Sequence, residues 1–279
     1  MKIVHISDIH INADPVAGSD TVTAFRQCLA HVEKHHGAAD LVVISGDLTH
    51  HGRLESYRKL HELLASSPLR PVLMMGNHDH RETFLSVFPD SERDENGYVQ
   101  SVRDAGGHRA IFLDTNLVAN HSGRLGPRRI AWLADRLADA RRDGTPVLLF
   151  LHHHPVAIGV LATDIIGLVQ KKAFADMLRE NRDIVRHVFF GHCHMSLSGS
   201  IEGVPFSAPR STSHPGWPDF EGRLAYGHGP IEPSYNLVLI DGGTVVVHTI
   251  EYRLEDRIVW EPLTGGPADS VTVPPGSRG

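Results

Sequence analysis

The segment KIVHISDIH, residues 2–10, places two polar side chains directly after a short apolar run. Lys2–Ile6 is rich in Val and Ile and predicts a buried strand, and Asp8 and His10 follow its end. Carboxylate oxygen and imidazole nitrogen both bind divalent metals. On its own, Asp8-x-His10 is equally compatible with a turn or a helix cap. The meaning of the pair therefore depends on the residues at the ends of the other strands of the chain.

Metal-binding residue types also follow most of the other predicted strands. The further short apolar runs are Leu41–Ser45, Pro71–Met75, His108–Leu113, Pro146–Leu151 and Val185–Phe190. The first, second, fourth and fifth of these runs are followed by Asp47, Asn77-His78-Asp79, His152-His153-His154 and His192-x-His194, respectively. In an open α/β sheet the carboxyl ends of the strands form one rim, so these groups are expected to converge in one crevice. Each motif has an ordinary turn interpretation, but independent turns would not all select metal-binding residues.

Amphipathic segments alternate with these strands and predict an α/β fold in which helices cover a sheet. They are Thr21–His36, Leu54–Ser66, Pro127–Arg142 and Lys171–Glu180. The histidines in or beside these segments are expected to be solvated, and they are His31, His35, His36 and His61. Cys28 and Cys193 are expected to be small, buried apolar residues.

After Ser196 the pattern changes to that of β-hairpins. The expected strands are Ser198–Ile201, Val204–Ala208, Tyr235–Asp241 and Thr244–Ile250, with Gly-containing turns inside each pair. Pro209–Pro233 separates the pairs, and a connection of this length is typical of a functional or a disordered loop. We expect one domain over residues 1–263, in which residues 196–263 supply the C-terminal strands and a lid or oligomerisation loop. A flexible tail is expected at Thr264–Gly279.

Composition argues against several classes of protein. A chain of 279 residues with 41% hydrophobic content can bury one large core. The formal net charge of -6 at pH 7 argues against a long nucleic acid as partner, because such a partner requires a basic face. Two cysteines are too few for a disulfide framework. Because no signal sequence is recognisable and no apolar stretch approaches ~18 residues, we expect a cytoplasmic protein with no membrane partner.

Together, the strand-end motifs from Asp8 to His194 resemble the signature of the calcineurin-like metallophosphoesterases. Within that superfamily the chain is most similar to the class III cyclic nucleotide phosphodiesterases and the related bacterial glycerophosphodiesterases. Those enzymes are αββα sandwiches with two adjacent metal ions. The resemblance therefore implies an αββα sandwich here, with a small C-terminal β-hairpin and lid region. The mixed nitrogen and oxygen ligands would accept Mn, Fe, Zn or Co.

The resemblance also implies a role for each matching residue. Asp8, His10 and His194 would hold the first metal, Asn77, His153 and His192 the second, and Asp47 would bridge both. Within the run of three histidines, counting back from Pro155 selects His153 as the ligand. His152 is then a core neighbour, and His154 lies behind the ligands or faces the substrate.

The implied activity is metal-dependent hydrolysis of small phosphodiesters, either cyclic nucleotides or glycerophosphodiesters. Two metals would share a hydroxide of lowered pKa that attacks the phosphorus atom, and would hold the phosphate oxygens. His78 would contact the phosphate and assist the leaving group. Asp79 would either orient His78 by a hydrogen bond or simply anchor the loop. His50 and His214 could face the substrate, although an exposed loop position is equally compatible with His50.

Other activities and assemblies fit the motifs less well or are left open. A protein phosphatase is disfavoured because Asp79 stands where those enzymes usually have Glu. A nuclease of the same superfamily would need a basic track, and a non-catalytic scaffold would have lost ligand positions, whereas none is lost. Two divalent ions, less two carboxylates and one hydroxide, leave a formal charge of about +1, which favours a diester monoanion. Trp217 and Phe220 in the long loop would form a lid or a contact in a homodimer or larger oligomer.

Overall fold

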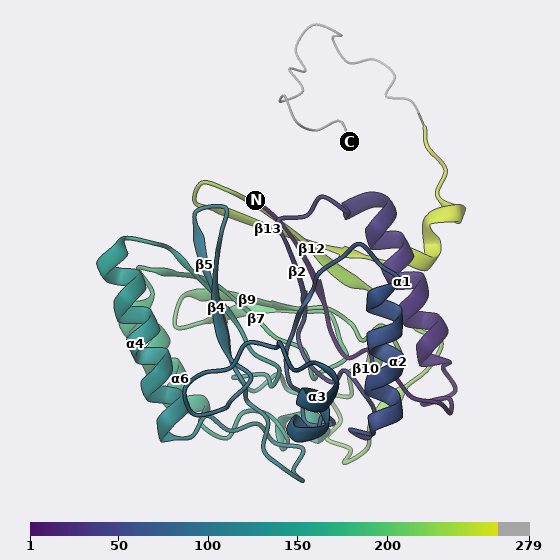
Figure 1. Cartoon of the computed structure of the whole chain (residues 1–279), viewed down its shortest axis with the longest axis horizontal. Coiled ribbons are helices and arrows are strands. Elements are labelled where there is room, and N and C mark those ends of the chain that lie inside the picture. The colour runs from purple at the N-terminus through teal and green to yellow at the C-terminus, as the bar shows by residue number, and fades with distance from the viewer. Residues whose placement is uncertain (262–279) are drawn as a thin grey trace, which may run out of the picture.

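Two β-sheets pack face to face and helices cover both outer faces, so the chain forms an αββα sandwich (Figure 1). The computed structural model describes residues 1–261. In Figure 1, α4 (Pro127–Asp143) and α6 (Lys171–Asn181) lie on one side of the sheets, and α1 (Thr21–His36) and α2 (Leu54–Ala65) on the other. The αββα fold implied by the family resemblance is therefore confirmed.

Each sheet contains a set of adjacent parallel strands. The first sheet has the order β13-β12-β1-β2-β3 and consists of β1 (Lys2–Ile6), β2 (Leu41–Ile44), β3 (Val72–Leu73), β12 (Tyr235–Asp241) and β13 (Thr244–Ile250). The second has the order β4-β5-β6-β7-β9-β8 and consists of β4 (Ser101–Ala105), β5 (His108–Phe112), β6 (Val147–Phe150), β7 (Val185–Phe189), β8 (Leu197–Ile201) and β9 (Val204–Ala208). Strands β1 to β3 run parallel in one sheet, and β5, β6 and β7 run parallel in the other.

Alternation along the central strands fills the core on both faces of each sheet. In β6, Leu148 and Phe150 pack between the two sheets, whereas Val147 and Leu149 pack with residues of α4 and α6. Burial of both faces explains why these strands are continuous apolar runs in the sequence. Burial of each Leu or Phe side chain contributes roughly 1.5–3 kcal/mol to the stability of the fold, so packing on both faces of the sheet holds the central strands in place.

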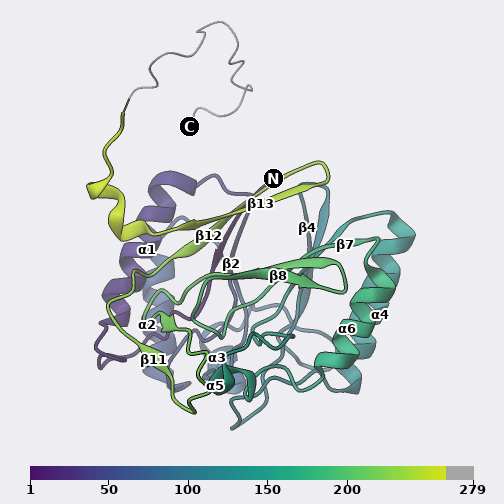
Figure 2. The same cartoon turned by 180° about the vertical axis from the view of Figure 1, so that it is seen from behind.

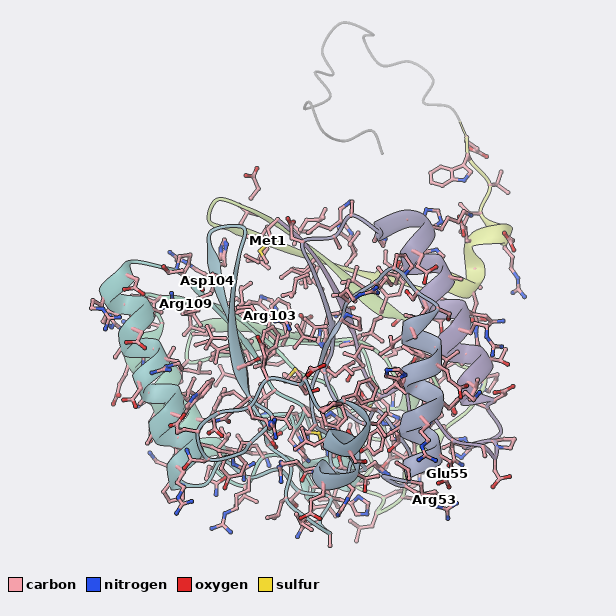
Figure 3. The ribbon with its side chains drawn as sticks, in the orientation of Figure 1. Met1, Arg53, Glu55, Arg103, Asp104 and Arg109 are labelled. Carbon is pink, nitrogen blue, oxygen red and sulfur yellow. The ribbon has the colours of Figure 1, made fainter. Side chains whose placement is uncertain are left out.

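Most predicted helices and strands are confirmed, and several short elements are additional. The additional elements are α3 (Arg81–Val87), α5 (Leu161–Asp164), β4, the ribbon of β10 (Gly216–Trp217) and β11 (Gly227–His228), and the 3₁₀ helix η1 (Tyr252–Arg257). Strand β4 is an edge strand with exposed polar residues, which explains why no apolar run predicts it. Asp104 on β4 accepts a hydrogen bond of 2.9 Å from Arg109 on β5, and Figure 3 shows both residues on this hairpin.

The long connection between the predicted hairpins carries exposed aromatic side chains. Pro209–Pro233 contains the β10–β11 ribbon, and Trp217 and Phe220 within it are exposed. The flexible tail predicted at Thr264–Gly279 lies outside the described residues. Across residues 1–261, none of the helices combines the length and the hydropathy that crossing a bilayer requires.

The carboxyl ends of the parallel strands meet at one edge of the sandwich. Helix α3 follows β3 and α5 follows β6, and both lie at the edge opposite the N-terminus (Figures 1 and 2). Backbone hydrogen bonds join the loops there, from Asp8 N to Gly46 O at 3.2 Å and from Gly191 N to His152 O at 3.0 Å. The loops that carry the predicted ligands therefore form one connected surface.

Candidate metal centre

An unusual backbone conformation positions most of the predicted metal ligands. The residues with a positive φ include Asp8 (55°), His10 (45°), Asp47 (50°), His192 (67°) and His194 (56°). A side chain other than Gly rarely adopts this left-handed region, and each instance costs about 1–3 kcal/mol. The cost is offset by bonds between loops, such as the one from His10 N to Asp47 O at 2.9 Å. Strain of this kind concentrates at functional sites.

Two glycines allow the ligand loops to approach each other closely. A Cβ atom on Gly76 would lie 2.1 Å from Oδ1 of Asp47, and one on Gly191 would lie 2.9 Å from Oδ2 of Asp8. Neither distance is possible for a real side chain. Gly76 is therefore required by the packing of Asp47, and Gly191 by that of Asp8 and of Ser7, whose Oγ would lie 1.9 Å from the added Cβ atom.

Four of the predicted ligands converge on a first position. One atom each from Asp8, His10, Asp47 and His194 lies within 4.8 Å of the others, and all four residues are buried. Nε2 of His10 is 3.1 Å from Nε2 of His194 and 3.5 Å from Oδ2 of Asp47. In their neutral form, each of the two imidazoles can direct a nitrogen lone pair to this position, beside the carboxylate oxygens of Asp8 and Asp47. This arrangement suits a cation that accepts lone pairs from all four residues.

A second group of ligand atoms adjoins the first and shares Asp47 with it. Oδ1 of Asn77 is 2.8 Å from Nδ1 of His192 and 3.2 Å from Nε2 of His152. The same Nε2 of His152 is 3.4 Å from Oδ1 of Asp47. Asp47 thus directs Oδ2 to the first group and Oδ1 to the second, which is the arrangement expected of a carboxylate that bridges two metals.

The structure brings His152, rather than His153, against Asn77 and Asp47. Side chains alternate along β6, and His152 continues the inward phase of Leu148 and Phe150. The sequence prediction selects His153 by counting back from Pro155, which does not take this alternation into account. Nδ1–H of His152 donates to the carbonyl of Ser45 at 2.9 Å, which leaves the lone pair of a neutral ring on Nε2.

His153 lies close to the centre but its ring nitrogens are already partnered. Its Nδ1 is 2.8 Å from the hydroxyl of Thr115, and its Nε2 is 3.2 Å from the carbonyl of His121. A carbonyl oxygen only accepts, so Nε2 must carry the proton in this contact. One nitrogen each from His152, His153 and His192 still falls within a 4.8 Å group. The prediction that His152 is only a core neighbour therefore differs from the observed geometry.

The charge balance of the centre also favours bound cations. Burial opposes ionisation of Asp47, yet His152 and His78 hold its pKa well below the usual value. Burial opposes protonation of His152, but Asp47 and Asp8 raise its pKa to about 9. The two buried carboxylates thus require positive charge next to them. Divalent cations would meet the same requirement and would leave the imidazoles neutral, as metal ligation needs.

His78 is positioned by a backbone carbonyl and not by Asp79. Its Nδ1–H donates to the carbonyl of His50 at 2.8 Å, and its ring lies 4.8 Å from that of His10. The carboxylate of Asp79 instead accepts from the backbone N–H groups of Gly76, Leu48 and Thr49 and from the hydroxyl of Tyr57, at 2.9–3.2 Å. Among the described residues, no hydrogen bond joins Asp79 to His78. Asp79 is a loop anchor, and burial followed by the charge of Asp47 raises its pKa to about 6.

The three expected substrate contacts occupy different environments. The ring of His50 stacks on His78 at 5.1 Å, and the ring of His214 lies 4.7 Å from that of His10. Both are near the centre and are only partly buried. His154, in contrast, is fully buried, and its Nε2 is 3.6 Å from Asp164 at the end of α5. The prediction that His154 faces the substrate does not agree with this burial.

One residue at the centre has no counterpart among the predicted ones. His121 is exposed, its Nδ1 is 3.1 Å from Nδ2 of Asn77, and its ring lies 5.4 Å from that of His78. It belongs to the loop that follows β5. Asp114-Thr115-Asn116 comes directly after that strand, so the rule applied to the other strands would have indicated this loop as well.

Comparison with known sequences agrees with this geometry. A family model described as calcineurin-like phosphoesterase matches residues 1–196. The chain is 33% identical over 261 residues to a probable cyclic nucleotide phosphodiesterase of Rhodopseudomonas palustris, an alignment that covers 91% of this chain and 94% of that protein. It is 29% identical to a probable glycerophosphodiester phosphodiesterase of Arcobacter nitrofigilis, with 70% of this chain and 72% of that protein covered.

A solved structure shows the same fold at low sequence identity. The crystal structure of a dimetal phosphatase from Danio rerio superposes with a TM-score of 0.66 and 15% identity, and covers 89% of this chain and 95% of that one. The architecture is therefore shared, and the family match spans all the strand-end motifs from Asp8 to His194. The chain belongs to the calcineurin-like phosphoesterase family.

Proposed function

We propose that this protein hydrolyses small phosphodiesters at a centre of two divalent metal ions. The observation that carries the proposal is the placement of Asp47, whose two carboxylate oxygens face two adjoining groups of ligand atoms. The relatives from Rhodopseudomonas palustris and Arcobacter nitrofigilis are named for cyclic nucleotide and glycerophosphodiester substrates, and both classes are small diesters.

The described side chains divide into two ligand sets. Asp8, His10 and His194 would hold one ion, Asn77, His152 and His192 would hold the other, and Asp47 would contact both. When bound, such ions lower the pKa of a water molecule and stabilise negative charge on phosphate oxygens. The mixed nitrogen and oxygen donors suit Mn, Fe, Zn or Co.

His78 is the proposed proton donor to the leaving group. Its Nδ1–H is held by the carbonyl of His50, so the protonated ring presents its second proton on Nε2. The half-buried ring lies next to His10 and so borders the first ligand set. A group in this position can protonate the departing alkoxide, and general acid catalysis of this kind typically contributes 10²- to 10⁴-fold in rate.

His121 and His50 are the proposed contacts for the phosphate or its substituents. His50 stacks on His78. Exposed His121 lies in the loop after β5 and approaches both Asn77 and His78. Both rings can donate a hydrogen bond to a phosphate oxygen. The net charge of -6 keeps the proposal to small diesters, because a long nucleic acid would need an extended basic surface.

An activity panel on metal-reconstituted protein tests this proposal. We expect turnover of bis-p-nitrophenyl phosphate to exceed that of p-nitrophenyl phosphate, and turnover of at least one of 3′,5′-cyclic, 2′,3′-cyclic and glycerol-linked diesters. Asp47→Ala should abolish turnover because both ligand sets lose a member. Metal-loaded wild-type protein that cleaves only the monoester would contradict the proposed substrate class.

A further inference from the structure

The proposed metal centre at the ends of the strands, called the strand-end centre, consists of Asp8, His10, Asp47, Asn77, His152, His192 and His194. A second cluster of metal-ligating side chains lies away from it. His31 and His35 are one helical turn apart on α1, and Glu255 comes from η1. One ligand atom from each of the three lies within 4.8 Å of the others. Figure 1 shows the yellow turn of η1 against the upper end of α1. Segments that are more than 200 residues apart in the sequence therefore contribute to one cluster.

The contacts in the cluster converge on a point between the two elements. Nε2 of His31 is 3.6 Å from Oε2 of Glu255, and Nε2 of His35 is 2.7 Å from Oε1. The His35 contact does not have the alignment of a hydrogen bond, so this buried nitrogen atom has no hydrogen-bond partner. A short approach without alignment is expected when two ligand atoms point toward a third position rather than toward each other.

The residues around the cluster prepare it for a metal ion. The hydroxyl of Tyr235 is 2.9 Å from Nδ1 of His31, and a proton on Nδ1 leaves the lone pair on Nε2. The His31 and His35 side chains are 12% and 34% exposed, so an ion can reach them from solvent.

We infer that His31, His35 and Glu255 form a separate binding site for a divalent transition metal, with Zn²⁺ as the best match. Two imidazoles at positions i and i+4 of a helix, together with one carboxylate, are a common donor set for Zn²⁺. A water molecule can complete four-coordination at the exposed side. Such an ion would tie η1 to α1, which Arg253 and Gln27 already join by a hydrogen bond of 3.0 Å.

Lys34 competes with the ion for Glu255. Its Nζ is 2.9 Å from Oε1 of Glu255, and its side chain is 63% exposed. A bound metal must displace the lysine from this oxygen. Because exposed ion pairs are weak, removal of the lysine charge should tighten metal binding only by roughly two- to fivefold. Lys34→Met therefore gives a prediction opposite in sign to that for the ligand variants.

The site also borders a cavity that extends toward the strand-end centre. A cavity of about 920 Å³ is lined by His31, Lys34 and Glu255 at one end and by Ser213 and His214 at another. His214 also contacts the first ligand set of the strand-end centre, since its ring is 4.5 Å from that of His194. An ion that fixes η1 would therefore fix one wall of the space beside that centre.

Zinc stoichiometry tests the inference. Full-length wild-type protein, His35→Ala and Glu255→Gln would be loaded with Zn²⁺, dialysed and analysed for metal by mass spectrometry. His61→Ala is the matched control, because His61 is exposed on α2 and outside the cluster. The readout is the difference between variants, so it does not depend on how many ions the strand-end centre holds. Circular dichroism would verify that each variant is folded.

We expect wild-type protein and His61→Ala to bind one more equivalent than His35→Ala and Glu255→Gln. Hydrogen exchange should show Zn²⁺-dependent protection of residues 252–257 in wild-type protein and none in Glu255→Gln, whose side chain keeps its shape. Equal stoichiometry in all four proteins, or protection that persists in Glu255→Gln, would overturn the inference. Lys34→Met should bind the additional ion more tightly, and weaker binding would also count against it.

Discussion

The run of three histidines at residues 152–154 shows how neighbouring side chains of one type take different roles. His152 faces Asn77 and Asp47, His153 contacts Thr115 and the carbonyl of His121, and His154 is buried against Asp164. The difference follows from where each ring nitrogen points and which group meets it. Residue type alone could not distinguish the three.

Metal analysis of single variants should separate the first two of these histidines. His152→Ala removes a nitrogen that lies 3.2–3.4 Å from two other ligands, so we expect about one metal equivalent to be lost at the strand-end centre. His153→Ala removes the bonds to Thr115 and His121 and should leave that equivalent in place. The reverse pattern in metal content would restore His153 as the ligand.

His78 allows a test that separates proton transfer from metal binding. We expect His78→Ala to keep its metals and to lower kcat for an alkyl diester by roughly 10²- to 10⁴-fold. For bis-p-nitrophenyl phosphate the loss should be much smaller, because p-nitrophenolate leaves without protonation. Parallel kinetics on both substrates, with metal content measured on the same samples, would reveal the split. An equal loss on both substrates would exclude the proton-donor role.

At the scale of secondary-structure elements, Asp79 ties together two loops that carry ligands. Its buried carboxylate accepts hydrogen bonds from the N–H groups of Leu48 and Thr49 after β2 and of Gly76 after β3. Asp47 lies in the first of these loops and Asn77 in the second. Asp79 therefore acts on the centre through the backbone, which is a positioning role.

Asp79→Asn should destabilise the fold without a direct effect on proton transfer. The new NH₂ group would face backbone donors, and the loss of one buried acceptor costs about 1–3 kcal/mol. We expect urea unfolding to show this decrease, together with weaker metal binding. Asp135→Asn, an exposed change on α4, is the control and should have little effect. Unchanged stability in Asp79→Asn would show that the anchor is dispensable.

The parts of the structure that the sequence predicts well are those with a strong local signal. Central strands such as β6 are continuous apolar runs because both faces are buried, and α1 spans the residues Thr21–His36 that its spacing predicts. Strand β4 has no such signal, because one of its sides faces solvent at the sheet edge. The division into two sheets is also invisible in the local pattern, and the family resemblance supplied it.

Within the site, the sequence predicts which residues converge but not how each ring is oriented. Polar residues that directly follow parallel strands are expected at one edge of the sheets, where those strands end. This expectation brings Asp8, Asp47 and His192 together. It does not predict that His78 is held by the carbonyl of His50, since backbone partners leave no mark on the sequence. Exposed His121 belongs to the same category, because its place depends on the path of a loop.

At the scale of the whole molecule, His5 and His187 are buried in the layer between the two sheets. His5 on β1 pairs with the hydroxyl of Ser45 at 2.8 Å, and His187 on β7 pairs with that of Ser207 at 2.9 Å. Burial lowers the pKa of His5 to about 3 and that of His187 to about 4. Both rings are therefore neutral in the folded protein at pH 5, where a histidine in the unfolded chain, with a pKa of about 6.5, is mostly charged.

This difference makes the stability of the sandwich depend on pH with a definite sign. As the pH falls below about 6.5, the unfolded chain binds protons that the folded chain does not, so each histidine should lower the free energy of unfolding by about 1.4 kcal/mol per pH unit until its folded pKa is reached. His187→Gln keeps a polar group near Ser207 and should reduce the slope by that amount between pH 6 and pH 5. Urea unfolding in the presence of a chelator removes the contribution of metal loss, and His61→Gln is the exposed control. If His187→Gln has the same pH dependence as wild-type protein, His187 does not remain neutral between the sheets.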